Sequence, residues 1–184
     1  MPAALLVMDF QLGIVERFAG SAEVVARARA ALDAARAREL RVVFVRVGFR
    51  DGYPEVSSRN RGFSAAADRG DLGEGDAGTQ VVAELAPRPG ETVVVKRRVS
   101  AFTGSDLEVV LRAAEVDHLV LAGIATSGVV LSTLREAADR DYRLTVLGDA
   151  CVDADPEVHR VLTEKVFPRQ ADVITADEWV AGLG

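Results

Sequence analysis

The chain has 184 residues, and its 22 lysines and arginines against 28 aspartates and glutamates give a formal net charge of −6. This acidity argues against a nucleic-acid-binding protein, which would need a basic face to displace counterions from phosphates. Hydrophobic residues make up 49% of the chain, which excludes a disordered polypeptide. No uncharged apolar run reaches the roughly 18 residues that a membrane span requires, so we expect no membrane partner.

Strand-like and helix-like patterns alternate from one end of the chain to the other. Apolar runs typical of strands occupy residues 3–9, 41–47, 92–95, 118–122, 143–147 and 171–174. Helical spacing of apolar residues occurs in 22–39, in a short stretch around 79–86, and in 107–114, 130–138 and 158–166. Asp155-Pro156 is typical of a helix start, and Thr175 and Glu178 have capping-box spacing before a C-terminal turn.

Near-continuous apolar strands that alternate with helices predict a parallel sheet with helices on both faces. We find no internal repeat and no linker, so residues 1–184 are predicted to form a single doubly wound α/β domain, Rossmann-like, with about six strands. In such sheets ligands bind beyond the carboxyl ends of the strands, where the strand order reverses. The residues that directly follow each strand are therefore the first candidates for a functional site.

Residues 48–78 do not fit this alternation. They contain seven glycines, several charges and little periodicity. A loop of that length is uncommon in a compact domain unless it is functional or mobile. It is either a flexible insertion or a lid that contacts substrate, and its candidate contact residues are Arg50, Tyr53, Arg59, Asn60 and Arg61.

Two charged residues end apolar strands. Asp9 closes the first strand, where an acid acts either as a helix N-cap or as a catalytic group. Lys96 closes the third, in a chain where only two of the 22 basic residues are lysines. Unlike arginine, lysine has a pKa that burial can move. The two residues could form a proton-transfer pair, with a surface salt bridge as the alternative.

The segment 123–130, Gly-Ile-Ala-Thr-Ser-Gly-Val-Val, follows a strand and opens a helix. Thr126 or Ser127 could cap that helix. Its first backbone N–H groups could hold an anion or a developing oxyanion.

Taken together, these elements resemble the isochorismatase-like hydrolase superfamily, which includes isochorismatases, nicotinamidases and N-carbamoylsarcosine amidohydrolases. The resemblance rests on Asp9 with Gln11, on Lys96 followed by Ser-Ala-Phe at 100–102, and on Gly-Ile-Ala-Thr at 123–126. It extends to Asp149-Ala150 and so covers nearly the whole chain. Members usually form homo-oligomers, which implies a dimer or larger assembly.

In the cysteine-hydrolase branch, an Asp, a Lys and a Cys form the catalytic triad, and a cis peptide helps to shape the oxyanion hole. The resemblance implies that Asp9 is the acid or base and Lys96 its partner. It also implies that Ile124–Ala125, next to Thr126, is the cis bond. The cysteine position, six residues after the motif's glycine, is Val129. The candidate substrate-contacting residues are Gln11, Arg50, Tyr53, Phe102 and Ser127.

Valine carries no nucleophile, so the thioester mechanism of the amidases cannot run at position 129. Isochorismatases of the superfamily also lack this cysteine and use Asp as a general acid on a vinyl ether. In them the position typically holds glycine, whereas Val129 is larger. Nicotinamidases bind zinc through an Asp and histidines after the second strand, but residues 48–78 contain no histidine. We therefore expect no metal, and the glycine spacing predicts no nucleotide cofactor.

The remaining nucleophiles and bases are few. Cys151, the single cysteine, is read as a small buried residue. Ser127 and Ser132 have no histidine near them in the sequence, and His118 and His159 are interpreted as structural. One cysteine allows no intrachain disulfide, and residues 1–20 lack the pattern of a secretory signal, so we expect a cytoplasmic protein.

Three hypotheses follow. The first is a cofactor-independent hydrolase that uses Asp9 and Lys96 for acid–base chemistry on a small anionic substrate, as in vinyl-ether hydrolysis, with arginines of 48–78 holding a carboxylate. The second is a non-catalytic homologue that binds a ligand or takes part in an assembly. The retention of both charged residues counts against it, because a dead site has no reason to keep a buried charge pair. The third is an amidase that uses Cys151 or a serine.

Overall fold

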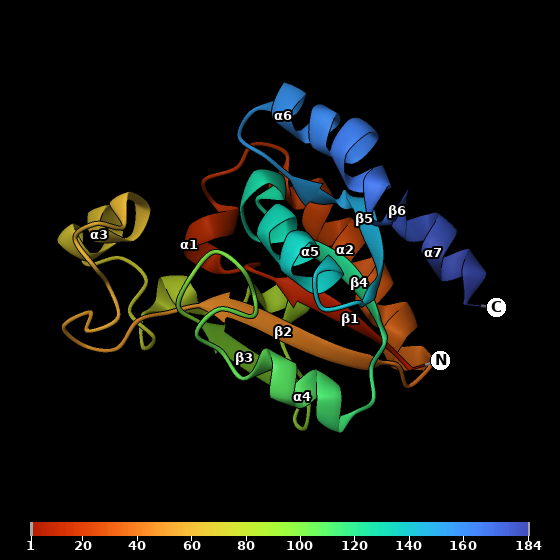
Figure 1. Ribbon diagram of the computed structural model, residues 1–184, viewed down its shortest axis with the longest axis horizontal. Coiled ribbons are helices and arrows are strands. Elements are labelled where there is room, and N and C mark those ends of the chain that lie inside the picture. The colour runs from red at the N-terminus through yellow and green to blue at the C-terminus, as the bar shows by residue number, and fades with distance from the viewer. Residues whose placement is uncertain (1, 184) are drawn as a thin grey trace.

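The computed structural model describes residues 2–183, and its centre is a six-stranded parallel sheet (Figure 1). The strand order is β3-β2-β1-β4-β5-β6. The strands are β1 (Ala3–Met8), β2 (Arg41–Val47), β3 (Thr92–Lys96), β4 (His118–Ile124), β5 (Arg143–Val152) and β6 (Asp172–Ile174). This is the doubly wound α/β fold that the alternation of strands and helices predicts.

Helices cover both faces of the sheet. They are α1 (Leu12–Val15), α2 (Ser21–Ala37), α3 (Arg61–Asp68), α4 (Leu107–Ala113), α5 (Leu131–Ala138), α6 (Pro156–Val161) and α7 (Ala176–Gly182). Shorter helical turns occupy Ala77–Thr79, Ala83–Leu85, Thr126–Val130, Leu162–Val166 and Phe167–Arg169. The buried side chains of α4 and α5 share one hydrophobic core, and those of α2 and α7 share the other. Among the described residues, no helix has the length and apolar character needed to cross a membrane.

The topology places the reversal of strand order between β1 and β4. The chain runs outward from β1 through β2 to β3 and then returns to the other side of β1 as β4. Met8, at the end of β1, lies opposite Gly123 of β4. The residues that follow these two strands therefore lie at the point where doubly wound sheets bind ligands.

Local patterns explain most of the helices. The predicted buried face of α2 is confirmed, because the residues at helical spacing from Val24 to Ala35 are buried against the sheet. Asp155 caps α6 by accepting the N–H of Glu157, and Thr175 forms a complete capping box with Glu178 at the start of α7. These are the caps that the sequence predicts.

Two predicted helices differ from the structure. Residues 79–86 do not form one helix. Two separate helical turns lie there instead: Ala77–Thr79, which ends at the start of the predicted range, and Ala83–Leu85, which lies within it. The predicted apolar face of 158–166 is buried mainly at Leu162, whereas Val158 is 37% exposed. Helix α6 contacts the turn at Thr126–Val130, and Leu162, which follows it, belongs to the hydrophobic core.

The segment 48–78 is not a structureless loop. It contains α3, which begins after Asn60, whose side chain accepts the N–H of Phe63 at 3.1 Å. Figure 1 shows α3 standing apart from the sheet and its other helices. Only Ala66 of α3 is buried. The helix spans only eight residues and is flanked by charged residues and glycine, so it is too short to stand out in the sequence pattern.

Candidate active site

The ends of β1 and β4 approach each other closely because residue 123 is glycine. A Cβ atom placed on Gly123 would lie 2.9 Å from the carbonyl oxygen of Met8 and 3.3 Å from Cγ1 of Val129. Real Cβ atoms do not come within 3.0 Å of backbone oxygens in this way, so a larger residue would push the two strands apart. The glycine thus brings residue 129 and the end of β1 to one place.

Asp9 and Lys96 form an ion pair at the carboxyl ends of their strands. Oδ2 of Asp9 lies 2.9 Å from Nζ of Lys96. Asp9 leaves the strand with φ of 58°, a left-handed conformation, and its N–H donates to the carbonyl oxygen of Val45. Asp9 is 5% exposed and Lys96 is 2% exposed, so the pair is buried and is not a surface salt bridge.

The contacts of Lys96 use its whole hydrogen-bonding capacity. Besides Asp9, its ammonium donates to the carbonyl oxygens of Arg98 at 3.0 Å and of Val99 at 2.9 Å. A lysine ammonium has three protons, so each proton has one acceptor. The charge is therefore held at one position by two neighbouring residues of its own chain segment as well as by Asp9.

The carboxylate of Asp9 is satisfied on one side only. Its Oδ1 is buried and has no hydrogen-bond partner among residues 2–183. Burial raises the pKa of this carboxyl above its ordinary value of 3.8, and Lys96 offsets only part of that effect through its charge and its hydrogen bond. A buried acid with an elevated pKa and one free oxygen is suited to giving or taking a proton.

The turn after β4 carries a cis peptide bond between Ile124 and Ala125, at the position that the resemblance implies. Neither Thr126 nor Ser127 caps the following helix, contrary to the prediction. The hydroxyl of Thr126 instead lies 2.8 Å from Nδ1 of His159, and the N–H of Ser127 donates to Asp153 at 2.7 Å. That N–H is therefore engaged by a carboxylate and is not free to hold an anion.

Val129 lies in the same turn, buried and in the hydrophobic core beneath α4 and α5. Its side chain faces Gly123 at the end of β4. The position that the resemblance assigns to the nucleophile is thus a buried apolar residue, close to the point between β1 and β4 where the strand order reverses.

Two of the predicted substrate contacts, Gln11 and Phe102, also make contacts within the fold. Gln11 has no exposed surface, and its side-chain amide donates to the carbonyl oxygen and accepts the N–H of Val47, both at 2.8 Å. Phe102 is buried, its ring stacks on Tyr142 with 6.1 Å between centroids, and the guanidinium of Arg140 lies over it. These contacts fix the positions of both side chains in the fold.

The predicted contacts from 48–78 have their polar partners within that segment. Arg50 is exposed and pairs with Glu55 at 3.2 Å, and the hydroxyl of Tyr53 donates to the carbonyl oxygen of Asp71. The structure thus gives neither residue a polar contact with the Asp9–Lys96 pair. The segment is nevertheless joined to β3, because Arg97 and Arg98, which directly follow Lys96, both contact Glu55.

Sequence reasoning missed the contribution of His159 and Asp153. Both lie after β5, a strand that ends at Val152, and both reach the turn after β4. Their position in the sequence could have indicated this contact, because residues that follow neighbouring parallel strands meet at one edge of the sheet. His118, by contrast, lies at the start of β4 and contacts Thr145, which agrees with a structural role.

Cys151 lies opposite Gly123 in the sheet and is 3% exposed. Burial raises the pKa of its thiol to about 12, against the smaller effect of a hydrogen bond from the Gly123 backbone. The thiol is therefore protonated at neutral pH, whereas thiolate is the nucleophilic form. No group of three or more His, Cys, Asp or Glu side chains within residues 2–183 could hold a metal ion.

Comparison with known proteins agrees with this geometry. The isochorismatase domain matches residues 3–178. Ureidoacrylate amidohydrolase RutB of Stutzerimonas stutzeri is 34% identical over 176 residues, covering 84% of this chain and 71% of the relative. An isochorismatase family protein from Burkholderia thailandensis superposes with a TM-score of 0.86 at 30% identity, covering 98% of this chain and 95% of the other. N-carbamoylsarcosine amidase from Thermoplasma acidophilum gives a TM-score of 0.78 at 30% identity, with coverage of 96% and 98%. This chain belongs to the isochorismatase family of hydrolases.

Proposed function

We propose that the protein hydrolyses a small anionic substrate by acid–base chemistry of Asp9 and Lys96, without a covalent cysteine intermediate. The observation that carries this proposal is the asymmetry of the Asp9 carboxylate. One oxygen is held by Lys96, and the other is buried with no partner in the described part of the chain. An unpaired buried oxygen is costly, and a protonated or substrate-bound carboxyl removes that cost.

Vinyl-ether hydrolysis is the best-defined form of this chemistry. Asp9, protonated on Oδ1, gives its proton to the terminal carbon of the enol ether, and the ether carbon becomes cationic. Water adds there and returns a proton to Asp9. The resulting hemiketal breaks its bond to the alcohol oxygen, which releases a ketone and an alcohol. During the transfer Lys96 stabilises the carboxylate that Asp9 becomes, while the raised pKa keeps a proton available at higher pH.

We infer that the substrate is negatively charged because the segment 48–78 carries arginines that could bind a carboxylate. Arg50 is exposed on the segment 48–78, and guanidinium groups bind carboxylates well. The segment lies beyond β2, and Arg97 and Arg98 join it to the strand that carries Lys96. Arg50 therefore belongs to the segment that is anchored beside the end of β3.

The experiment is the release of pyruvate from isochorismate by the purified protein, beside Asp9→Asn and the surface variant Asp33→Asn. We expect release by the wild type and by Asp33→Asn, and a loss of about 10²- to 10⁴-fold in Asp9→Asn, assayed at a temperature where circular dichroism shows that this variant is folded. Equal release by Asp9→Asn would refute the role of Asp9. No release by the wild type would remove the vinyl ether as substrate.

Amide hydrolysis is the second candidate, because two of the similar proteins are an amidohydrolase and an amidase. It requires a nucleophile, and neither Val129 nor the protonated thiol of Cys151 supplies one. A non-catalytic role in ligand binding or assembly also follows from valine at position 129. The buried Asp9–Lys96 pair argues against it, because a protein without chemistry gains little from an ion pair that must be desolvated.

A further inference from the structure

A polar cluster on α5 is connected to Lys96 through the loop between β3 and α4, residues 97–106, here named the 97–106 loop. Two of the three acceptors of the Lys96 ammonium are carbonyl oxygens of this loop, those of Arg98 and Val99. The position of the ammonium therefore depends on where the loop backbone lies.

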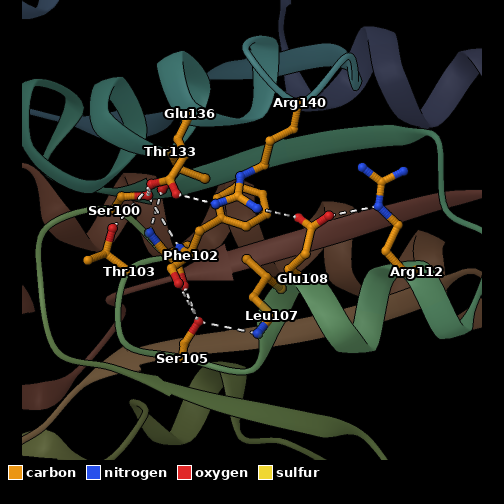
Figure 2. A network of polar contacts seen from close by, with 11 residues as sticks. Ser100, Phe102, Thr103, Ser105, Leu107, Glu108, Arg112, Thr133, Glu136 and Arg140 are labelled. Carbon is orange, nitrogen blue, oxygen red and sulfur yellow. Dashed lines mark hydrogen bonds and ion pairs between the residues drawn. The ribbon is translucent and has the colours of Figure 1, made fainter.

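The loop is fastened to α5 directly after these carbonyls (Figure 2). The hydroxyl of Ser100 donates to Oε2 of Glu136 at 2.5 Å, and the hydroxyl of Thr103 donates to the same oxygen at 3.2 Å. The N–H of Ala101 donates to the hydroxyl of Thr133, one turn earlier on α5, at 2.9 Å. Ser100 and Thr133 are buried, so the bonds that they form are partly shielded from water, whereas Thr103 is exposed.

The carboxylate that accepts these bonds is itself held in place. Arg140, just after the end of α5, donates to Oε1 of Glu136 at 2.6 Å and leaves Oε2 for the two hydroxyls. Burial disfavours the charged form of Glu136, but the hydrogen bonds from Ser100, Arg140 and Thr103 and the positive charge of Arg140 together outweigh it and lower the pKa. Glu136 is thus a charged acceptor at neutral pH, and hydrogen bonds to charged groups are the stronger ones.

We propose that Glu136 is a positioning residue for Lys96, because it fixes the 97–106 loop so that the carbonyls of Arg98 and Val99 hold the ammonium against Asp9. The inference rests on the proposed function, in which Asp9 and Lys96 act together. It also gives α5 a part in the site at each end, since this helix follows the turn that carries Val129.

The chain offers a matched control on the other side of the same network. Glu108, on α4, also pairs with Arg140, at 3.0 Å, and with Arg112 at 2.7 Å. Figure 2 shows it facing these two arginines, and its side-chain bonds go to them rather than to the 97–106 loop. Replacing Glu108 removes the same charge from Arg140 but leaves the hydroxyls of Ser100 and Thr103 with their acceptor.

The test is a carbon-13 NMR titration of the Asp9 carboxyl, assigned by its loss in Asp9→Asn, in the wild type, Glu136→Ala, Ser100→Ala and Glu108→Ala. Lys96 lowers the pKa of Asp9, so an ammonium that moves away should let the midpoint rise. Removing the negative charge of Glu136 would by itself lower the midpoint of Asp9. A rise in the Asp9 midpoint therefore indicates that Lys96 has moved away, because loss of the Glu136 charge alone would lower that midpoint.

We expect a rise in Glu136→Ala, a smaller rise in Ser100→Ala and none in Glu108→Ala. An unchanged or lower midpoint in Glu136→Ala, or an equal rise in Glu108→Ala, would overturn the proposal. If Glu136→Ala does not fold, the neutral change Ser100→Ala decides in the same way. The titration needs no substrate, so its outcome is independent of the pyruvate assay that tests the proposed function. If that assay succeeds, Glu136→Ala should lower kcat by about tenfold or more with little change in KM.

Discussion

Nδ1 of His159 and the hydroxyl of Thr126 lie 2.8 Å apart, although 33 residues separate them in the chain. The contact joins α6 to the turn between β4 and α5. Asp153 reinforces it by accepting the N–H of Ser127. The turn that carries Val129 is therefore held from outside by the segment that follows β5.

This contact makes stability depend on the protonation of His159. Burial lowers the pKa of His159 below its ordinary 6.5, and attraction to Asp153 offsets only part of the effect. As pH falls, the unfolded chain takes up the proton first. The contribution of neutral His159 is therefore full above pH 6.5 and is lost as pH falls below it.

We expect the free energy of unfolding of His159→Asn, measured with urea, to fall less than that of the wild type between about pH 7.5 and pH 5. His118 also has a pKa lowered by burial. His118→Asn should therefore remove a separate share of the pH dependence. Identical pH dependence in the wild type and in His159→Asn would contradict the prediction.

The buried pair predicts strong coupling between Asp9 and Lys96. Lys96→Met leaves a buried carboxylate without its counter-ion, and we expect a loss of about 3 kcal/mol at neutral pH. The loss should shrink in acid, because protonated Asp9 needs no counter-ion. Adding Asp9→Asn should recover part of the stability. Urea unfolding of the four proteins of the cycle measures this coupling, and strictly additive losses would show that the pair is not coupled.

Cys151 should be inert in the folded protein. Its thiol is buried and has a pKa raised to about 12, so little thiolate forms at neutral pH. We expect iodoacetamide to leave the native protein unmodified and to alkylate one thiol per chain in denaturant, as measured by intact mass. Cys151→Ala should retain any hydrolase activity. Alkylation of the folded protein that abolishes activity would instead revive a cysteine mechanism.

Position 129 can be tested by restoring a thiol. If the surrounding site is otherwise that of a cysteine hydrolase, Val129→Cys should gain activity towards small amides and ureido compounds, measured as ammonia release. Val129→Ala is the control, because it opens space without adding a nucleophile. Activity in both variants would be due to space rather than to the thiol. No gain in Val129→Cys would mean that the turn at 126–130 does not support covalent chemistry.

The sequence predicted much of the fold and the contact between Asp9 and Lys96 for one physical reason. Parallel strands alternate with helices, and their carboxyl ends must meet at a single edge, so charged residues that end two nearby strands can pair. The pairing needed only the ends of β1 and β3. These are marked in the sequence, because an apolar run stops at a charge.

The contact of His159 with Thr126 could not be predicted in this way. It depends on β5, which continues to Val152 rather than ending near residue 147, and on a shift in its register with β4 between Leu121 and Gly123. These features bring α6 back over the turn at 126–130. The distance between elements that are remote in sequence is set by packing, and no local pattern records it.

The side chain of Gln11 takes the place of a peptide group. At Asp9 the chain turns out of β1 in a left-handed conformation, yet Val47 still finds both a donor and an acceptor, supplied by the amide of Gln11. The glutamine thus supplies the two hydrogen bonds that a continuation of β1 would have made to β2. The backbone can therefore leave the sheet at Asp9 and present its carboxylate. A variant at position 11 would accordingly lose both hydrogen bonds to Val47 and disturb the backbone beside Asp9.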